Sequence, residues 1–384
     1  MLNTKHDYIY RDHLTMQQIS ESQLEINRQL LLTINYRTWS RDSHELFDYE
    51  STDIHIGSHI INGPCRLIRH GMEVVPVDSN SVDFQENTDL LLNVKVKGNH
   101  YYIFPSCLNI PISTYYPQKG MWLVVKALSR GVYTLRESDI LKLGRYKLRV
   151  RMLVTEEDQK REGDALLSQL FFVLSSLFVK NEVPMITTDD LKYDDKVHCR
   201  FCLFGYSDPA NPLIEVCECK GSIQFIHFLC LRNWISYKLT IDDKENQQYY
   251  FVYKPINCEL CHAIFPTYAI INGKRSPILE IPRFKAPYIV LENFGVTNRG
   301  LHVCSLAVNN ECKLGRGHES NIRIGHVSIS RWHATIKYSD GEFLISDHES
   351  KFGTLIALRR PIILNSNNHI TVQVGRCVIG LDVS

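Results

Sequence analysis

The chain lacks an excess of charge of either sign. Among its 384 residues, 43 lysines and arginines almost balance 42 aspartates and glutamates, which gives a formal net charge of +1. Nucleic-acid-binding proteins usually show a basic excess or a basic cluster, so the composition predicts no nucleic-acid partner. The apolar fraction of 44% and the charged fraction of 22% are ordinary for globular protein, and the length predicts two or three domains.

Long hydrophobic runs are also missing. The most apolar stretch spans residues 165–179 and is interrupted by Ser168, Gln169, Ser175 and Ser176. A helix needs about twenty apolar residues to cross a bilayer, and the N-terminus has no apolar core of a secretory signal. These absences predict a soluble intracellular protein, cytoplasmic or nuclear, with no membrane span.

Motifs of several common enzyme classes are absent as well. The sequence contains no glycine-rich phosphate cradle of the P-loop kind and no nucleophile–base motif. Five of the twelve cysteines are scattered and odd in number, which predicts reduced thiols rather than a disulfide framework. These five are Cys65, Cys107, Cys304, Cys312 and Cys377.

The other seven cysteines lie close together with one histidine. They form four pairs along the chain: Cys199-x2-Cys202, Cys217-x-Cys219, His227-x2-Cys230 and Cys258-x2-Cys261. A tight turn can present each pair to one ion, and zinc prefers four thiolate or imidazole ligands in a closed tetrahedral site. Eight ligands therefore predict two zinc ions. The spacing alone leaves open whether adjacent or alternate pairs share an ion.

The segment NPLIEVCECKGSIQFIHFLCLRNWI, followed by CELC, closely resembles the RING-CH family, the RING variant of the membrane-associated ubiquitin ligases. The resemblance covers about residues 197–265 and implies a cross-braced arrangement. One zinc ion would be held by Cys199, Cys202, His227 and Cys230, and the other by Cys217, Cys219, Cys258 and Cys261.

A PHD finger, which reads histone tails, has the same order of ligands and is the main alternative. PHD fingers usually carry a tryptophan two residues before the seventh ligand, where this chain has Ile256. Instead, Trp234 lies four residues after Cys230, where RING-CH domains carry a tryptophan. The sequence therefore favours RING-CH.

The RING-CH resemblance implies ubiquitin transfer without a covalent intermediate. Such ligases hold a ubiquitin-conjugating enzyme and its thioester-linked ubiquitin in a reactive orientation. The conjugating enzyme would dock on an apolar groove that the resemblance assigns to Phe201, Trp234 and Ile235. Active RING domains often have a basic residue after the last cysteine, and this chain has His262 there. The alternative is a non-catalytic scaffold in which zinc only stabilises the fold.

Three further motifs follow in the C-terminal region: Gly315-Arg316, Ser330-x-x-His333 and Ser350-Lys-Phe-Gly-Thr354. Each falls where a predicted strand gives way to a loop, and loops at one end of a β-sandwich can converge on one site. The spacing resembles a forkhead-associated (FHA) domain over about residues 285–384. This resemblance implies a site that captures phosphothreonine in a partner protein.

A phosphate carries about −1.5 to −2 charges at pH 7, and an arginine can bind it bidentately. We therefore assign Arg316 and Ser330 to the phosphate and Arg331 as an additional cation. We expect His333 to brace the loop and Gly353 and Thr354 to shape the turn. Phe352 stands where the family often has an asparagine that bonds the peptide backbone. The alternative is a degenerate sandwich whose arginine forms an internal ion pair.

These patterns divide the chain into five parts. We expect a polar, helical segment at 1–53, a β-sandwich at 54–154, a helical linker at 155–190, the zinc domain at 191–275 and the FHA domain at 276–384. The helical spacing of the first part is that of Ile19, Leu24, Ile26, Leu30 and Leu31. The predicted fold is thus a multidomain, β-rich α+β chain in which a cross-braced two-zinc domain lies between two sandwiches.

The two predicted sandwiches share a faint repeat. Residues 141–150 align with residues 372–381 on a common Gly-Arg pair. Because the N-terminal region has neither Ser-x-x-His nor Gly-Thr, we expect it to be a degenerate FHA-like copy that has lost the pocket. Arg145 is therefore not assigned as a ligand.

Overall fold

The computed structural model describes residues 30–41, 45–78, 88–106, 120–178, 186–187, 197–205, 208–243, 248–252, 257–266, 268–279, 281–293, 300–366 and 368–384. The chain divides into two compact units. Unit 1 combines Met1–Leu148 with Glu311–Ser384, and unit 2 is Arg149–Asn310. As predicted, the chain is β-rich, and the cysteine–histidine region lies in the sequence between two strand-rich regions.

In the described part of unit 1, nearly all of the regular secondary structure is strand. Its N-terminal strands are β1 (Leu32–Trp39), β2 (Ile54–Ile61), β3 (Cys65–His70), β4 (Glu73–Asp78), β5 (Thr88–Lys97), β6 (His100–Pro105), β7 (Met121–Val124), β8 (Val132–Thr134) and β9 (Ile140–Leu143), with the short 3-10 helix η2 (Val125–Ala127) after β7. Its C-terminal strands are β20 (Glu311–Gly315), β21 (Ile322–Arg323), β22 (Ala334–Ser339), β23 (Glu342–Asp347), β24 (Thr354–Leu358), β25 (Ile362–Leu364), β26 (His369–Val374) and β27 (Cys377–Val383). Strand β10 (Tyr146–Val154) contains the boundary to unit 2.

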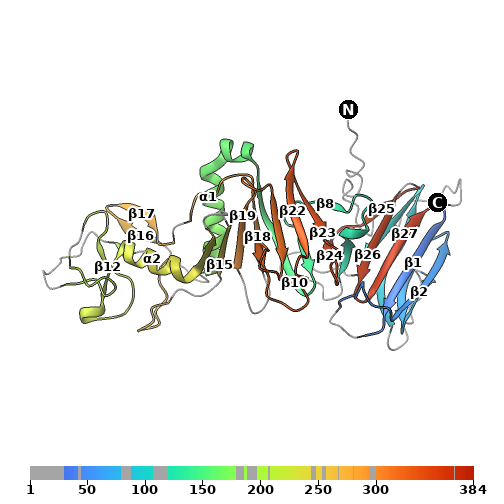
Figure 1. The fold of residues 1–384 in the computed structure, drawn as a ribbon, viewed down its shortest axis with the longest axis horizontal. Helices are drawn as coiled ribbons and strands as arrows, with labels where there is room; N and C mark the ends of the chain where they lie inside the picture. Colours follow the sequence, from blue (N-terminus) through green and yellow to red (C-terminus); the bar gives the residue numbers. More distant parts are fainter. Residues whose placement is uncertain are drawn as a thin grey trace. The chain divides into compact units, whose positions relative to one another are not determined.

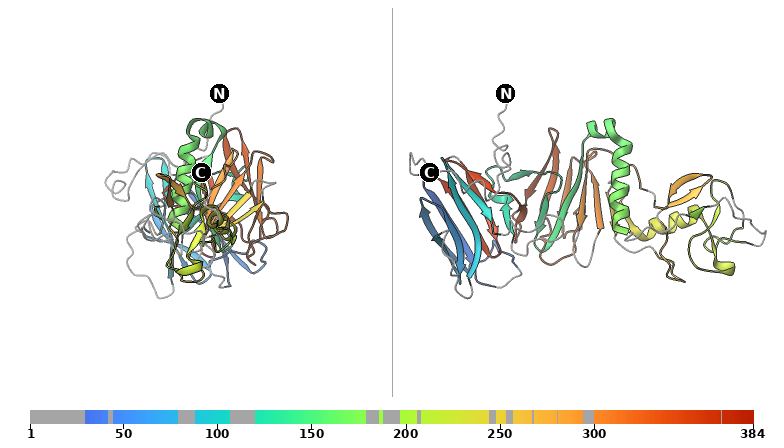
Figure 2. Two further views of the ribbon diagram at one scale, coloured as in Figure 1. Left: turned by 90° about the vertical axis from the view of Figure 1, so that its left-hand side faces the viewer. Right: turned by 180° about the vertical axis from the view of Figure 1, so that it is seen from behind.

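The N-terminal and C-terminal strands of unit 1 alternate within shared sheets. One sheet has the order β9-β24-β7-β26-β27-β1-β2, a second has β21-β20-β22-β23-β8, and a third has β25-β6-β5-β3-β4. In Figure 1 the blue strand β1 lies beside the red strand β27, and the view from behind in Figure 2 shows the same pairing. Strands from both ends of the chain therefore build the sheets of unit 1 together.

Strand β1 also corrects the expected helix at 1–53. Ile19, Leu24 and Ile26 lie outside the described residues, but Leu32–Trp39 pairs with both β2 and β27. Leu32, Ile34 and Tyr36 are buried while the residues between them are more exposed. This period of two matches a strand with one buried face. It overrides the helical spacing that includes Leu30 and Leu31.

The repeat around Gly-Arg is a shared hairpin turn. Gly144 and Gly375 both have a φ of 55°, which glycine adopts without steric cost. Gly375 and Arg376 form the two-residue loop between β26 and β27, because Val374 pairs with Cys377. Two-residue hairpin loops of this kind favour residues that tolerate positive φ. The sequence repeat therefore reflects the same type of turn at two positions in the chain.

Unit 2 contains both α-helices of the described residues. Its elements are α1 (Glu156–Phe178), β11 (Ile186–Thr187), β12 (Leu213–Glu215), η3 (Gly221–Ile223), β13 (Phe225–His227), α2 (Phe228–Leu239), β14 (Thr240–Asp243), β15 (Gln248–Val252), β16 (Tyr268–Ile271), β17 (Lys274–Pro277), β18 (Tyr288–Asn293) and β19 (Gly300–Ser305). Strands β14, β15, β19 and β18 are consecutive neighbours in one sheet. Because β19 pairs with β15 and β18, these strands belong to unit 2. We had expected the FHA domain to begin at residue 276, but strands β18 and β19 lie in unit 2.

Helix α1 begins at Glu156, within the predicted helical linker at 155–190. The Asp158 N–H donates to Thr155 Oγ1 over 3.2 Å, and the Thr155 N–H donates to Asp158 Oδ2 over 3.1 Å. This reciprocal pair is a capping box, which satisfies otherwise unpaired amides at a helix start. At Glu162 the backbone leaves helical geometry, with a φ of −134°, just before Gly163. Within the described residues, no helix combines the length and the apolarity that a bilayer crossing requires.

One hydrophobic core runs through unit 2. It contains Leu170 of α1, Phe251 of β15 and Val303 of β19 together with Phe265 and Ile235 of the cysteine–histidine region. The cysteine–histidine region is therefore packed onto the sheet of the same unit. Three of its cysteines, Cys199, Cys219 and Cys258, belong to the same core.

Candidate zinc centre and phosphate site

The first and the last cysteine pair have the same backbone geometry. The Leu203 N–H donates to the Cys199 carbonyl over 2.8 Å, and the His262 N–H donates to the Cys258 carbonyl over 3.0 Å. Leu203 and His262 both have left-handed φ values, 64° and 61°. Each turn folds its two cysteines back toward one point, so each pair can serve one ion.

The third pair is placed by a strand and a helix. Strand β13 ends at His227, and α2 begins at Phe228, so Cys230 lies in the first turn of the helix. His227 is buried and pairs with Leu213 of β12 in the sheet register. The side chains of His227 and Cys230 are thereby brought to the first cysteine pair.

The eight side chains gather into two groups. Within each group the potential ligand atoms all lie within 4.8 Å of one another. The mixed group consists of Cys199, Cys202, His227 and Cys230, and the all-cysteine group consists of Cys217, Cys219, Cys258 and Cys261. The alternate pairs therefore meet, which is the cross-braced grouping that the RING-CH resemblance implies.

The spacing of the atoms fits zinc. The sulfurs of Cys219 and Cys258 are 3.6 Å apart, and Cys202 Sγ lies 3.2 Å from His227 Nδ1. Zn–S bonds of about 2.3 Å place two sulfurs of a tetrahedron about 3.8 Å apart. The mixed group and the all-cysteine group each offer one closed tetrahedral site, and together they account for two zinc ions.

The sulfurs of the all-cysteine group perturb one another's pKa values in opposite directions. Desolvation raises the pKa of Cys258, but N–H groups of Cys261 and Leu260 and the Arg200 guanidinium outweigh it, so the pKa is about 6. In contrast, desolvation and the neighbouring sulfurs raise the pKa of Cys219 to about 12. Thiolates at this spacing repel one another, and a bound divalent cation removes that conflict.

Arg200 is a residue of this centre that the sequence analysis missed. Its guanidinium donates to Cys217 Sγ over 3.6 Å and to Cys258 Sγ over 3.4 Å. Because Arg200 directly follows Cys199, its backbone adjoins the mixed group while its side chain supports the all-cysteine group. Only its position inside the first cysteine pair could have pointed to it.

The predicted docking residues are partly brought together. Phe201 and Trp234 stack with ring centroids 5.8 Å apart, and the Phe201 side chain remains 36% exposed. Ile235 is fully buried. It shares the inner face of α2 with Phe228 and Leu231, as the helical period requires. The prediction that Ile235 lines a docking groove is therefore wrong.

Other exposed apolar side chains surround Phe201 in sequence and occupy the equivalent turn of the last cysteine pair. Leu203 and Phe204 are 74% and 72% exposed, and Leu260 and Ile264 are 58% and 50% exposed. Soluble proteins expose single apolar residues commonly, but clustered ones mark contact surfaces. The sequence analysis missed these four, although each lies within three residues of a cysteine ligand. His262, between Leu260 and Ile264, is exposed.

In unit 1, the loops that carry Gly315-Arg316 and Ser330-Arg331 run side by side. The Arg316 N–H donates to the Ser330 carbonyl, and the Gly317 N–H donates to the Arg331 carbonyl, both over 2.9 Å. A Cβ on Gly315 would come within 2.1 Å of the Arg331 carbonyl oxygen. Glycine at 315 is therefore required for this close approach of the two loops.

His333 braces the site from below, as expected from the sequence. It is fully buried, and its Nδ1 accepts the Ser330 N–H over 3.1 Å. The proton must then lie on Nε2, which donates to the Gly353 carbonyl over 3.2 Å. His333 thus joins the Ser330 loop to the Gly353 turn and does not face a ligand.

Asp347 is a second residue that the sequence analysis missed. Its Oδ2 accepts hydroxyl protons from Ser350 and Thr354, each over 2.6 Å, and its Oδ1 accepts the Ser350 N–H over 2.9 Å. These bonds close the turn between β23 and β24. An aspartate three residues before a serine at a strand end is a signal for such a turn.

The three predicted phosphate ligands lie on the two loops that run side by side. Arg316 and Arg331 are exposed, and Arg316 Nε donates to the Ile329 carbonyl over 3.2 Å. Within the described part of the chain, neither arginine forms an ion pair, so the alternative of an internally paired Arg316 is not what the structure shows. Ser330 Oγ accepts the Lys351 N–H over 3.3 Å, which leaves its own proton to donate.

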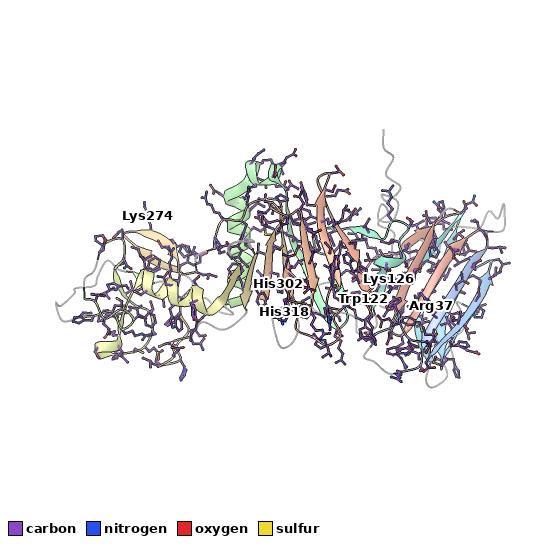
Figure 3. All side chains as sticks on the ribbon, in the orientation of Figure 1. Arg37, Trp122, Lys126, Lys274, His302 and His318 are labelled. Carbon is purple, nitrogen blue, oxygen red and sulfur yellow. The ribbon has the colours of Figure 1, made fainter. Side chains whose placement is uncertain are left out.

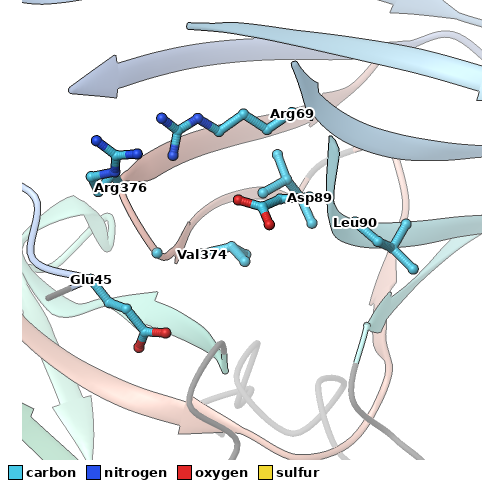
Figure 4. Close-up of a pocket in the computed structure, with 8 residues that line it drawn as sticks. Glu45, Arg69, Asp89, Leu90, Val374 and Arg376 are labelled. Carbon is cyan, nitrogen blue, oxygen red and sulfur yellow. The ribbon is translucent and has the colours of Figure 1, made fainter. Parts of the chain in front are cut away.

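A cavity of about 220 Å³ lies elsewhere in unit 1. Figure 4 shows Arg69 and Arg376 at one side of it, with Asp89 near Arg69 and Glu45 farther away. Arg69 donates to the Gly71 carbonyl over 2.8 Å, and Arg376 to the Ser40 carbonyl over 2.6 Å. Two cations and two anions balance, so this cavity does not offer the excess positive charge that a phosphate requires.

Comparison with known proteins matches both regions. A model described as "RING-variant domain" covers residues 199–261, and one described as "FHA domain" covers residues 312–373. The chain is 50% identical to "Probable E3 ubiquitin-protein ligase MARCHF10" of Rattus norvegicus over 42 residues, 11% of this chain and 5% of that protein. It is 32% identical to "E3 ubiquitin-protein ligase MARCHF3" of Mus musculus over 95 residues, 25% of this chain and 34% of that protein.

A longer match, 29% identical over 147 residues, is to "E3 ubiquitin-protein ligase MARCHF7" of Pongo abelii and covers 37% of this chain and 19% of that protein. The chain thus spans about a third or less of the length of these relatives. It contains a RING-variant domain and an FHA domain, as the sequence analysis predicted.

Proposed function

Because a RING-variant domain and an FHA domain occur in one chain, we propose that the protein is a RING-type ubiquitin ligase that recognises a phosphothreonine-containing partner. The FHA domain would bind the partner, and the RING-variant domain would recruit a ubiquitin-conjugating enzyme charged with ubiquitin. Joining the two in one chain raises the effective concentration of the partner near the enzyme. The relatives named as ubiquitin ligases support the proposal.

The observation that carries the ligase proposal is the apolar surface on the two similar ligand turns. Phe201 and Leu203 belong to the Cys199 turn, and Leu260 and Ile264 belong to the Cys258 turn. Exposed apolar side chains that lie together mark contact surfaces, and aromatic residues are enriched at protein interfaces. We propose that Phe201 and Trp234 contact the conjugating enzyme, with Leu203, Leu260 and Ile264 completing the surface.

The proposed phosphothreonine site rests on three side chains that can donate hydrogen bonds to a phosphate. Arg316 and Arg331 supply two exposed guanidinium groups, and Ser330 supplies a hydroxyl proton. Charge-assisted bonds from arginine to phosphate are about twice as strong as neutral ones. We propose these three residues as the phosphothreonine ligands.

The ligase proposal is tested by autoubiquitination with a panel of conjugating enzymes and zinc-loaded chain. We expect product with at least one enzyme of the panel and strong loss in Phe201→Ala. Tyr237→Ala is the matched control, because Tyr237 is an aromatic on α2 that is 88% exposed. Silence across the whole panel, with both zinc ions bound, would contradict ligase activity and favour the non-catalytic scaffold.

A further inference from the structure

A short N-terminal segment lies against the phosphate site of unit 1. We define the brace segment as residues 46–50 and the phosphate loop as residues 350–353. The Tyr49 N–H donates to the Lys351 carbonyl over 3.0 Å, and Lys351 Nζ lies 3.2 Å from Asp48 Oδ2. Asp48 is fixed in turn, because its Oδ1 accepts the Glu50 N–H over 3.0 Å. The two segments are therefore joined by a backbone bond and an ion pair.

The Tyr49 ring fills the space beside the turn of the phosphate loop. A Cβ on Gly353, whose φ is +73°, would come within 2.9 Å of Tyr49 Cε2. Lys126 Nζ lies 3.9 Å from the centroid of the Tyr49 ring and donates to the Ser350 carbonyl over 3.4 Å. The Tyr49 hydroxyl donates to Gln373 Oε1 over 3.0 Å. Tyr49 is thus held between the phosphate loop, a lysine and strand β26.

Phe352 connects the phosphate loop to the same N-terminal region. Its ring, with Tyr49, packs against a buried cluster of Trp39, Phe47 and Val378. Arg37 adjoins the same aromatic rings: its Cζ lies 5.9 Å from the ring centroid of Phe47 and 6.0 Å from that of Tyr49. Arg37 and Lys126 are labelled in Figure 3. Phe352 is therefore an anchor for the loop in this chain, where related domains often carry a peptide-binding asparagine.

Lys351 links this brace directly to the phosphate ligands. Its carbonyl accepts from Tyr49, and its N–H donates to Ser330 Oγ over 3.3 Å. Movement of the phosphate loop would therefore change the direction in which the Ser330 hydroxyl can donate. Binding groups that are held in place before the ligand arrives lose less entropy on binding.

We infer that Tyr49 is a positioning residue of the phosphate site: the brace segment holds the phosphate loop, and through it the Ser330 hydroxyl, in the orientation that phosphothreonine binding requires. The inference rests on the proposed phosphothreonine-binding function. It assigns a binding role to a segment that lies more than 260 residues before the FHA match.

A double-mutant cycle in the full chain tests this role. The probe is a phosphothreonine peptide selected from a random library on the wild-type chain. We expect Tyr49→Ala to weaken its binding about tenfold in the wild-type background and less than about twofold in the Ser330→Ala background, because coupled residues are non-additive. Tyr338→Ala is the matched control. Tyr338 is also a half-buried tyrosine, but it lies near the C-terminal end of β22, whereas His333 directly precedes the start of that strand. This substitution should leave affinity unchanged in both backgrounds.

A general loss of stability would weaken binding equally in both backgrounds, and that result would overturn the inference. If Tyr49→Ala does not fold, Lys126→Met replaces it, because it removes the cation above the ring and its bond to the Ser350 carbonyl. We then expect about a threefold loss with wild-type Ser330 and none with Ser330→Ala. Equal losses would again overturn the inference.

The two proposals fail in distinguishable ways. If the wild-type chain binds no phosphothreonine peptide, the proposed function fails and the positioning role falls with it. If the wild-type chain binds but Tyr49 and Ser330 act additively, only the positioning role fails. Amide exchange adds a readout without ligand: Tyr49→Ala should speed exchange at Lys351 and Gly353, and Tyr338→Ala should not.

Discussion

The zinc centre of unit 2 and the phosphate site of unit 1 are assembled in opposite ways. All eight zinc ligands lie between residues 199 and 261, in tight pairs that each form within a few residues. The proposed phosphate site instead depends on contacts from Tyr49 and Lys126 to a loop at 350–353, with the Tyr49 hydroxyl held by Gln373. The first site is built from local turns and a metal, while the second is built from strands far apart in the sequence.

The difference predicts which perturbations each site can survive. Removing one zinc ligand should damage unit 2 because the ligand cluster is held together by the ion. The phosphate site contains no metal-ligand group among its described residues, so it should respond instead to changes in buried polar contacts and in strand packing. The predictions below test this contrast, beginning with the largest effect.

Replacement of a zinc ligand should have the largest effect. We expect Cys258→Ser to lose the zinc ion of the all-cysteine group and to unfold its surroundings, because a structural zinc site contributes about 10–16 kcal/mol of apparent folding free energy. Elemental analysis should fall from two zinc ions to one. Cys304→Ser is the matched control, since Cys304 is a buried cysteine of unit 2 outside both groups. Two zinc ions retained in Cys258→Ser would contradict the assignment.

Loss of the proposed phosphate-binding cation should come next. We expect Arg316→Ala to weaken binding of a phosphothreonine peptide at least about tenfold, because a hydrogen bond to a charged group contributes about 1.5–3 kcal/mol. The unfolding temperature should hardly change, since Arg316 is exposed. Calorimetric titration measures the first and a thermal scan the second. Arg323→Ala, an exposed arginine on the neighbouring β21, should bind like the wild type.

Acid should destabilise unit 1 through His333. Desolvation lowers the pKa of this buried imidazole below its ordinary value of 6.5, although Asp347 and the Gly353 carbonyl oppose the shift. The unfolded chain therefore takes up a proton first as the pH falls, so stability is complete above about pH 6.5 and declines below it. Denaturant unfolding between pH 7.5 and 5 measures this slope.

His333→Asn separates the pH effect from the structural one. We expect it to cost about 1–3 kcal/mol at pH 7.5, because it leaves buried groups without partners, and to flatten the decline below pH 6.5. His318→Asn, at an exposed histidine of the same unit, serves as the control. A slope that persists unchanged in His333→Asn would assign the acid sensitivity to another group.

The smallest effect should follow from His262→Arg. A neutral imidazole offers one donor, whereas a guanidinium offers five, so under the proposed function we expect the variant to bond both conjugating enzyme and ubiquitin. We expect about a threefold faster transfer, consistent with one added hydrogen bond. The left-handed φ of 61° at this position limits the gain. Single-turnover discharge of a charged conjugating enzyme measures it, and a slower rate would contradict the role of this position.

The zinc ligands could be predicted from the sequence because cysteine and histidine residues at short, regular spacing are typical of zinc sites. The Cys-x2-Cys pairs 199–202 and 258–261 define local turns, and the family resemblance supplied the pairing. The helical period of Phe228, Leu231 and Ile235 could also have shown that Ile235 faces the core. Exposure of Leu203 could not be foreseen, since only the folded turn shows which face is covered.

The architecture of unit 1 could not be predicted from local patterns. Leu32–Trp39 alternates between buried and exposed positions, but nothing in a short window shows that β1 pairs with β27 or β7 with β24 and β26. Tyr49 escaped attention for the same reason, because its role depends on contacts with residues about 300 positions away. Long-range pairing is a property of the whole chain.

Transfer of ubiquitin to a phosphothreonine-bearing substrate tests the central claim most directly. A substrate carrying the selected peptide is incubated with ubiquitin, activating enzyme, a conjugating enzyme and the full chain, in phosphorylated and unphosphorylated form. We predict modification of the phosphorylated substrate alone, lost in Arg316→Ala and in Phe201→Ala. Equal modification of both forms, or none with any conjugating enzyme while the phosphorylated peptide still binds, would contradict the account.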